Sequence, residues 1–256
     1  MRKVLRAILP ALLALLVAPG AAAEADYGTV SLRAERFFKY QEWGSALAMY
    51  ELMLDMRPME IPTYYHAIFV SGMLRNENRQ MEMIERTQRQ GIALDSIFSG
   101  VRSVSFAMGE GDEYEKLLKL VRDRQPWLSR GIDIYLLEYY EYRNDADNMI
   151  LLAEALLNTT PDNIPYVRVL AKAYMMAGRI DESLTCYKHI LREIPLDYDA
   201  SLSLGVYYNS RLAESNTADA AADCAALAES YLADAYGVRP TPYVAEMLSK
   251  LRARRM

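Results

Sequence analysis

The sequence contains few of the residues that build metal sites and disulfide frameworks. It has 2 cysteines and 2 histidines in 256 residues, which is too little for a cysteine-rich zinc site or a disulfide scaffold. Positive charge is not in excess either, because 29 lysines and arginines face 34 aspartates and glutamates, for a net charge of −5. A protein that binds nucleic acid by neutralising phosphates needs the opposite balance. We therefore expect no metal, no cofactor and no nucleic-acid partner.

Catalytic motifs are also missing from the sequence. No serine lies in a Gly-x-Ser-x-Gly elbow, and no glycine-rich phosphate loop occurs. His66 and His189 each stand alone, without a second histidine or a carboxylate pattern around them. We expect structural or surface roles for both histidines and a protein that is not an enzyme.

The first residues read as an export signal. Three positive side chains precede an apolar stretch over residues 7–17, a Pro-Gly pair then breaks any helix, and three alanines end at Ala23. This is the layout of a secretory signal peptide, and we predict that residues 1–23 are cleaved after Ala23, with Ala25 as second choice. An uncleaved anchor is the alternative, but Pro10 and Pro19 leave a helix too short to span ~30 Å of bilayer. The mature chain is therefore expected in the periplasm or cell envelope.

The rest of the chain repeats itself with a period near 34 residues. Pro58 and Pro126 are 68 residues apart, which is twice 34, and the next gaps, to Pro161, Pro195 and Pro240, are 35, 34 and 45. Such a period in a helical sequence is typical of stacked helix-turn-helix arrays. The remaining composition, 52% hydrophobic and 25% charged, is that of an ordinary globular chain.

Residues inside each period keep fixed offsets that describe helix packing. A small residue (Ala46, Ser183, Ala228) is followed four positions later by a large one (Tyr50, Tyr187, Leu232) and eight later again by proline. We expect the small residue to let the second helix of a pair approach the first. The large residue then fills the gap to the next pair, and the proline ends the helix.

Leu204, Gly205 and Tyr208 match the L-G-x2-Y part of the tetratricopeptide pattern, and with the repeat period they make the chain resemble a tetratricopeptide-repeat protein. The resemblance covers about residues 27–242. It implies an all-α fold, a right-handed α-solenoid of about six helix pairs within one repeat domain, residues 24–256. The predicted repeats are 27–60, 61–94, 95–129, 130–163, 164–197 and 198–242, with a capping helix over 243–255.

Two repeats and one insertion depart from the pattern. Repeats 61–94 and 95–129 are degenerate, since Gln80 stands where a small residue belongs and Ile92 where a proline would. Residues 212–222 lengthen the sixth repeat, either as a helix extension, which we favour, or as a functional loop. Cys186 and Cys224 fall on neighbouring second helices about two turns out of register, ~10 Å along the axis. We expect free thiols there, with a disulfide as the alternative.

In this family the first helices line a concave face that holds peptides or partner helices. The repeat phase places aromatic, methionine and basic side chains there, together with Leu202 and Val206. The predicted groove residues are Phe38, Tyr65, Phe69, Phe106, Tyr142, Arg168, Lys172, Met175 and Met176. Such a groove suits an apolar or amphipathic segment, with a carboxylate near Arg168 and Lys172. The alternative is that these aromatics pack inside the repeats and leave no groove.

Together, the leader and the resemblance lead us to expect an exported protein–protein interaction scaffold that binds a peptide or partner helix during envelope assembly. A self-associating structural protein and a docking subunit for an envelope enzyme are the alternatives. The basic tail, Lys250, Arg252, Arg254 and Arg255, complements the dipole of a helix C-terminus. Weak contact with anionic lipid is the alternative role for this tail. The identity of the partner stays open.

Overall fold

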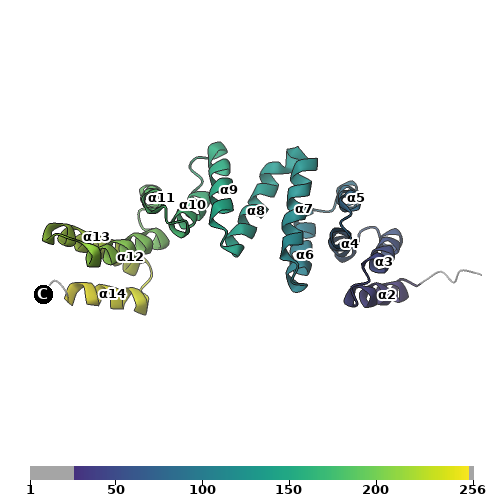
Figure 1. The fold of residues 1–256 in the computed structure, drawn as a ribbon, viewed down its shortest axis with the longest axis horizontal. Coiled ribbons are helices and arrows are strands. Elements are labelled where there is room, and N and C mark those ends of the chain that lie inside the picture. Colours follow the sequence, from purple (N-terminus) through teal and green to yellow (C-terminus); the bar gives the residue numbers. More distant parts are fainter. Residues whose placement is uncertain (1–25, 254–256) are drawn as a thin grey trace, which may run out of the picture. The chain divides into compact units, whose positions relative to one another are not determined.

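The computed structural model describes residues 26–253, and all regular secondary structure in this part of the chain is helical. It has thirteen α-helices, one short 3-10 helix and no strand (Figure 1), so the predicted all-α class is confirmed. The predicted signal peptide lies outside the described residues. Within residues 26–253, no helix is both long enough and apolar enough to cross a bilayer.

The chain divides into two compact units, here called the N-terminal unit, up to Leu120, and the C-terminal unit, from Val121. In the N-terminal unit, α2 packs on α3, α3 on α4, and α4 on both α5 and α6. The helices of this unit are α2 (Tyr27–Lys39), α3 (Trp43–Met56), α4 (Ile61–Met73), α5 (Glu77–Arg89), α6 (Leu94–Ala107) and the first part of α7 (Gly111–Arg124).

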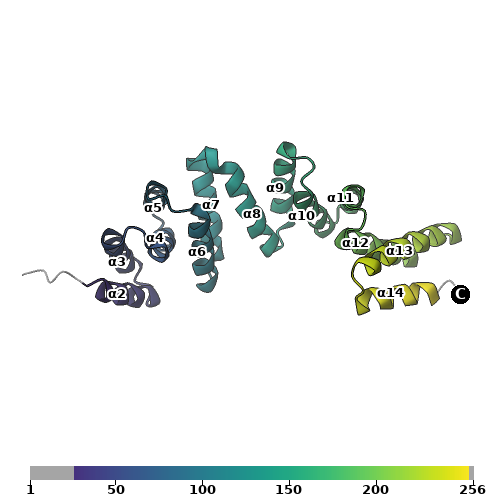
Figure 2. The same ribbon diagram turned by 180° about the vertical axis from the view of Figure 1, so that it is seen from behind.

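The C-terminal unit continues the same pattern of helix pairs. Here α8 packs on α9, α9 on α10, α10 on α11, α11 on α12, α12 on α13 and α13 on α14, and Figure 2 shows the last three helices side by side. After a 3-10 turn (Pro126–Leu128), its helices are α8 (Ser129–Arg143), α9 (Ala146–Thr159), α10 (Ile164–Met176), α11 (Ile180–Glu193), α12 (Tyr198–Glu214), α13 (Ala218–Val238) and α14 (Pro242–Ala253).

The small residues of the repeat lie where second helices meet first helices. Ala46, Ser183 and Ala228 are completely buried. The Ser183 hydroxyl donates to the carbonyl oxygen of Ala171, twelve residues earlier, at 2.7 Å. A larger side chain would push α11 away from α10, so the predicted packing role of these positions is confirmed. The large residues four positions later, Tyr50, Tyr187 and Leu232, are buried as expected.

In the degenerate repeat 61–94, a glycine on the first helix makes room for the large Gln80 side chain of the second helix. Gln80 is buried, and its amide nitrogen donates to the carbonyl oxygen of Ile68, again twelve residues earlier, at 3.3 Å. The space for this side chain comes from Gly72, where an added Cβ would lie 2.7 Å from the Gln80 amide nitrogen. The small partner has therefore moved from the second helix to the first.

The same repeat replaces its terminal proline with a glycine turn. Gly91 has a φ of +70°, and the Ile92 amide donates to the carbonyl oxygen of Thr87 at 3.0 Å. This left-handed turn ends a helix without proline, and it leaves Ile92 buried.

The insertion at residues 212–222 is mainly a helix extension, as favoured from the sequence. It lengthens α12 to Glu214 and starts α13 at Ala218, so only residues 215–217 lie between the two helices. The Thr217 hydroxyl accepts from the Ala220 amide at 3.2 Å and caps α13.

Candidate functional site

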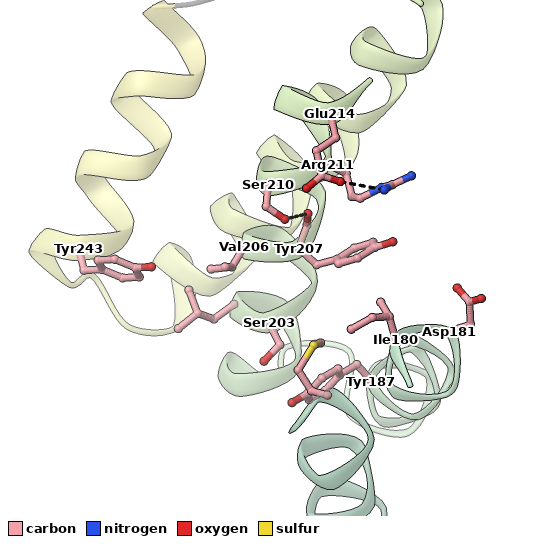
Figure 3. A pocket seen from close by; sticks show the side chains of 12 residues that line it. Ile180, Asp181, Tyr187, Ser203, Val206, Tyr207, Ser210, Arg211, Glu214 and Tyr243 are labelled. Atoms are coloured by element: carbon pink, nitrogen blue, oxygen red, sulfur yellow. Dashed lines mark hydrogen bonds and ion pairs between the residues drawn. The ribbon is translucent and has the colours of Figure 1, made fainter. Parts of the chain in front are cut away.

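A pocket of about 810 Å³ lies in the C-terminal unit and is the main candidate site (Figure 3). We call it the C-terminal pocket. It is formed by α10, the first half of α11, one face of α12, and the beginning of α14. Its lining residues are Met175, Ile180, Asp181, Tyr187, Leu202, Ser203, Val206, Tyr207, Ser210, Arg211, Glu214 and Tyr243.

The helix α12 supplies most of this lining because its residues recur four apart. Leu202, Val206 and Ser210 follow one another along one edge, and residues at this spacing share a helix face. The end of α12 adds two charged residues, Arg211 just before the extension and Glu214 within it.

The apolar side of the pocket is the edge of a buried core. Met175, Ile180 and Tyr207 pack against a cluster that includes Leu184 and Tyr187. In Figure 3, Tyr243 extends from α14 on one side, and Asp181 lies at the start of α11 on the other. Such a lining, apolar and aromatic with a few placed polar groups, is typical of sites that hold an apolar anchor.

A second pocket of about 420 Å³, here called the charged pocket, adjoins the first through Tyr187, which lines both. It contains Arg168 and Lys172, the two basic residues of the predicted groove. Lys172 pairs with Glu141 of α8 at 3.1 Å. Arg168 holds both carboxylate oxygens of Asp197, at 2.9 and 2.6 Å.

The Arg168–Asp197 pair has a structural task. Asp197 also caps α12, since its carboxylate accepts from the Ala200 amide at 2.8 Å. The Arg168 guanidinium holds the pKa of this carboxyl below its usual range. The chain itself thus supplies a carboxylate to Arg168 and to Lys172. The ligand carboxylate expected near these two residues stays a prediction, and it would have to compete with these pairs.

Three predicted groove residues lie instead in an aromatic cluster of the N-terminal unit. The Phe38 ring lies 5.5 Å from Trp43, 5.2 Å from His66 and 6.0 Å from Phe69, between centroids. The Tyr65 ring is 4.8 Å from His66. Phe69 is 1% exposed, so its placement in an open groove is wrong. Of these three residues, Phe69 is the one fully packed inside the repeat, as in the alternative stated from the sequence. Phe38 and Tyr65 are half-buried, and their place in a groove stays a prediction.

Sequence signals for this burial exist in α4 itself. Residues 67–70 read Ala-Ile-Phe-Val and cover every face of one helical turn. All four side chains are buried, because α3, α5 and α6 surround α4. A helix that is apolar all round is a core helix and offers no face to a ligand.

His66 in this cluster makes the stability of the N-terminal unit depend on pH. Burial among Phe38, Tyr50 and Tyr65 lowers its pKa below 6.5, and the Pro62 carbonyl and the charge of Glu35 oppose this only in part. Near pH 6.5, His66 therefore binds a proton more readily in the unfolded chain than in the folded chain. This contribution to stability is present above about pH 6.5 and is lost as pH falls below it.

We expect the free energy of unfolding to fall between about pH 7.5 and pH 5.5, and His66→Gln to flatten this dependence. Urea unfolding, followed by the fluorescence of Trp43 in a Trp127→Phe background, measures it. An equal slope in both chains would show that His66 is not the titrating group.

The other predicted residues are spread over several surfaces. Met175 lines the C-terminal pocket, whereas its neighbour Met176 is 41% exposed and is not part of the lining. Tyr142 on α8 is 62% exposed. Phe106 is half-buried on α6, with the Arg102 guanidinium 6.0 Å from its ring centroid.

Sequence reasoning missed the pocket residues that do not come from first helices. Ile180 and Asp181 begin a second helix, and Tyr243 belongs to the predicted capping helix. One usable signal was the lengthened sixth repeat, because a longer α12 exposes an extra turn next to the capping helix. Leu202 and Val206, which the repeat phase had placed inward, do line the pocket.

The remaining reactive groups form no further site in the described part of the chain. Cys186 and Cys224 are free thiols and half-buried; burial raises the pKa of Cys186 to about 11. Within residues 26–253, no three His, Cys, Asp or Glu side chains are grouped to hold a metal. In the basic tail, Lys250 pairs with Glu246 at 2.5 Å and Arg252 with Glu229 at 2.9 Å. Arg254 and Arg255 lie outside the described residues.

The chain is similar to solved structures of tetratricopeptide-repeat proteins. No protein-family model matches the sequence, and no curated protein matches it. A TPR repeats protein from Bacteroides fragilis is 15% identical, with a TM-score of 0.40 over 90% of this chain and 99% of that one. The C-terminal part of a TPR repeat-containing protein from Cytophaga hutchinsonii is 11% identical, with a TM-score of 0.44 over 84% and 98%. YrrB, a TPR protein with an unusual peptide-binding site, is 16% identical, with a TM-score of 0.30 over 91% and 94%. These likenesses concern the helical-repeat fold.

Proposed function

We propose that the chain is a non-enzymatic protein-binding scaffold whose C-terminal pocket holds a peptide or a partner helix. The observation that carries this proposal is the pocket of about 810 Å³ with its largely apolar and aromatic lining. Aromatic and methionine side chains present large, adaptable contact surfaces to an apolar anchor.

We also propose that this binding takes place in the cell envelope. The support is the leader pattern, in which positive charge precedes the apolar stretch 7–17 and small residues end at Ala23. A partner is then a protein segment that is accessible in the same compartment.

Site-specific photo-crosslinking in the native cell tests both proposals. With a benzoylphenylalanine probe at Leu202 in the pocket, we expect one heavy adduct, and mass spectrometry should map it to one contiguous partner segment. Val206→Asp introduces a charge into the apolar lining and should reduce the adduct at least about tenfold, since an unpaired buried charge is costly. Fractionation of the same cells should recover the adduct with the envelope.

The matched control is a probe at Leu151 on α9, which is 65% exposed and outside the pocket. Equal adducts from Leu151 and Leu202, or an adduct that survives Val206→Asp, would contradict a ligand in the pocket. Adducts to a second copy of the chain would favour self-association, and a cytoplasmic adduct would contradict the envelope location. A thermal melt of the Val206→Asp chain checks that it still folds.

A further inference from the structure

The C-terminal pocket has a charge pattern that restricts what it binds. Three charged residues line it, Asp181, Arg211 and Glu214. Arg211 and Glu214 form an ion pair at 2.9 Å, three residues apart on α12. The charges of Arg211 and Glu214 therefore neutralise each other, and Asp181 is the charge of the lining that has no counterpart.

Asp181 itself has no ion-pair partner within the described chain. It is exposed in the first turn of α11. Its backbone carbonyl accepts a hydrogen bond from the Thr185 hydroxyl at 2.8 Å. The nearest base along the sequence, Arg179, pairs with Glu182 at 3.0 Å and lies over the Tyr174 ring. The carboxylate of Asp181 is therefore available to a cation that enters the pocket.

The adjoining charged pocket does not require any particular charge on the ligand. Its four charged residues include two acids and two bases, and Arg168 and Lys172 are each paired with a carboxylate of the chain. A ligand charge would have to displace one of these pairs, which costs more than binding beside an unpaired carboxylate.

We infer that the pocket selects a segment of a partner protein in which a large apolar side chain is accompanied by a lysine or arginine. The apolar side chain enters beside Met175, Leu202 and Val206, and the basic residue pairs with Asp181. Complementary charge of this kind sets specificity more than total affinity. This inference rests on the proposed function and names the class of segment that the site takes.

The test uses a displayed library of random peptides selected on the immobilised full chain. We expect the enriched peptides to combine a large apolar residue with a basic one. Selection on Asp181→Asn should keep the apolar residue and lose the basic preference. For a peptide chosen on the unchanged protein, Asp181→Asn should weaken affinity up to about fivefold, the upper end of what exposed ion pairs contribute. At about 1 M salt, where charges are screened, the difference should vanish.

Glu182→Gln is the matched control. It removes an acid from the same first turn of α11, with the same loss of interaction with the helix dipole, but this carboxylate faces Arg179 and is not part of the pocket lining. Glu182→Gln should therefore leave peptide selection unchanged. Asp181→Lys should reverse the preference and select acidic peptides.

The outcomes separate this inference from the proposed function. Suppose that Val206→Asp abolishes peptide binding, but selection on Asp181→Asn yields the same sequences as the unchanged protein. The proposed preference for a basic residue is then wrong, while the pocket is still a binding site. If no enriched peptide depends on Val206, both proposals fail. If Glu182→Gln acts like Asp181→Asn, the effect belongs to the helix end, and the assignment of Asp181 is overturned.

Discussion

Phe69→Ala is expected to lower the free energy of unfolding of the N-terminal unit by about 4 kcal/mol, as for other buried phenylalanines. The side chain is 1% exposed, and its ring lies 6.0 Å from Phe38 and 6.1 Å from Trp43, between centroids. Truncation would leave a cavity among helices that cannot collapse freely, because α4 is enclosed by α3, α5 and α6. The expected loss of stability is therefore that of a residue in the hydrophobic core.

Trp43 offers a local reporter for this experiment. The chain has 2 tryptophans, and Trp127 is 74% exposed, so Trp127→Phe leaves Trp43 as the only indole at little cost in stability. Urea unfolding of this background, with and without Phe69→Ala, gives the difference. Tyr142→Ala, at a position 62% exposed, is the control and should change stability by no more than about 0.5 kcal/mol. A Phe69→Ala effect as small as that would return Phe69 to the surface of a groove.

Leu232→Ala is expected to destabilise the end of the C-terminal unit by about 3 kcal/mol. Leu232 is fully buried on α13 and belongs to a cluster with Val244, Leu248 and Leu251 of α14. It also fills the space over Gly205 of α12, where an added Cβ would lie 2.8 Å from Leu232 Cγ. One side chain therefore joins α12, α13 and α14.

Leu227→Ala is the control for this prediction, since it removes the same atoms from the same helix at a position 40% exposed. It should cost less than about 1 kcal/mol. Urea unfolding by circular dichroism gives the totals, and amide hydrogen exchange of α12–α14 localises the loss. Equal costs for the two leucines would mean that the capping helix is not held by Leu232.

The sequence predicted the helix pairs because local packing repeats with the chain. Small residues such as Ala46 and Ser183 stand four positions before a large residue, and this spacing places both side chains on the same face of a helix. Burial of Tyr114, Leu117 and Leu118, one apolar stripe of a degenerate repeat, was predictable for the same reason. These positions depend on neighbours that are close in sequence.

The binding surface could be predicted only in part because it depends on what covers each helix. The repeat phase identified Met175 and Val206, but the same reasoning placed Phe69 in a groove, where Trp43 and His66 belong to the cluster around it. Tyr243 and Asp181 join the pocket from a capping helix and a second helix. Such contacts arise from tertiary packing, and no offset within a repeat encodes them.

The exchange between Gly72 and Gln80 bears on how such repeats are found in other sequences. A comparison that scores each position separately counts Gln80 as a departure from the pattern and gives Gly72 no credit, although the two together fill one space. What the geometry of this contact limits is the combined volume of two side chains on facing helices. Degenerate repeats of this kind should therefore become recognisable when facing positions are scored as pairs.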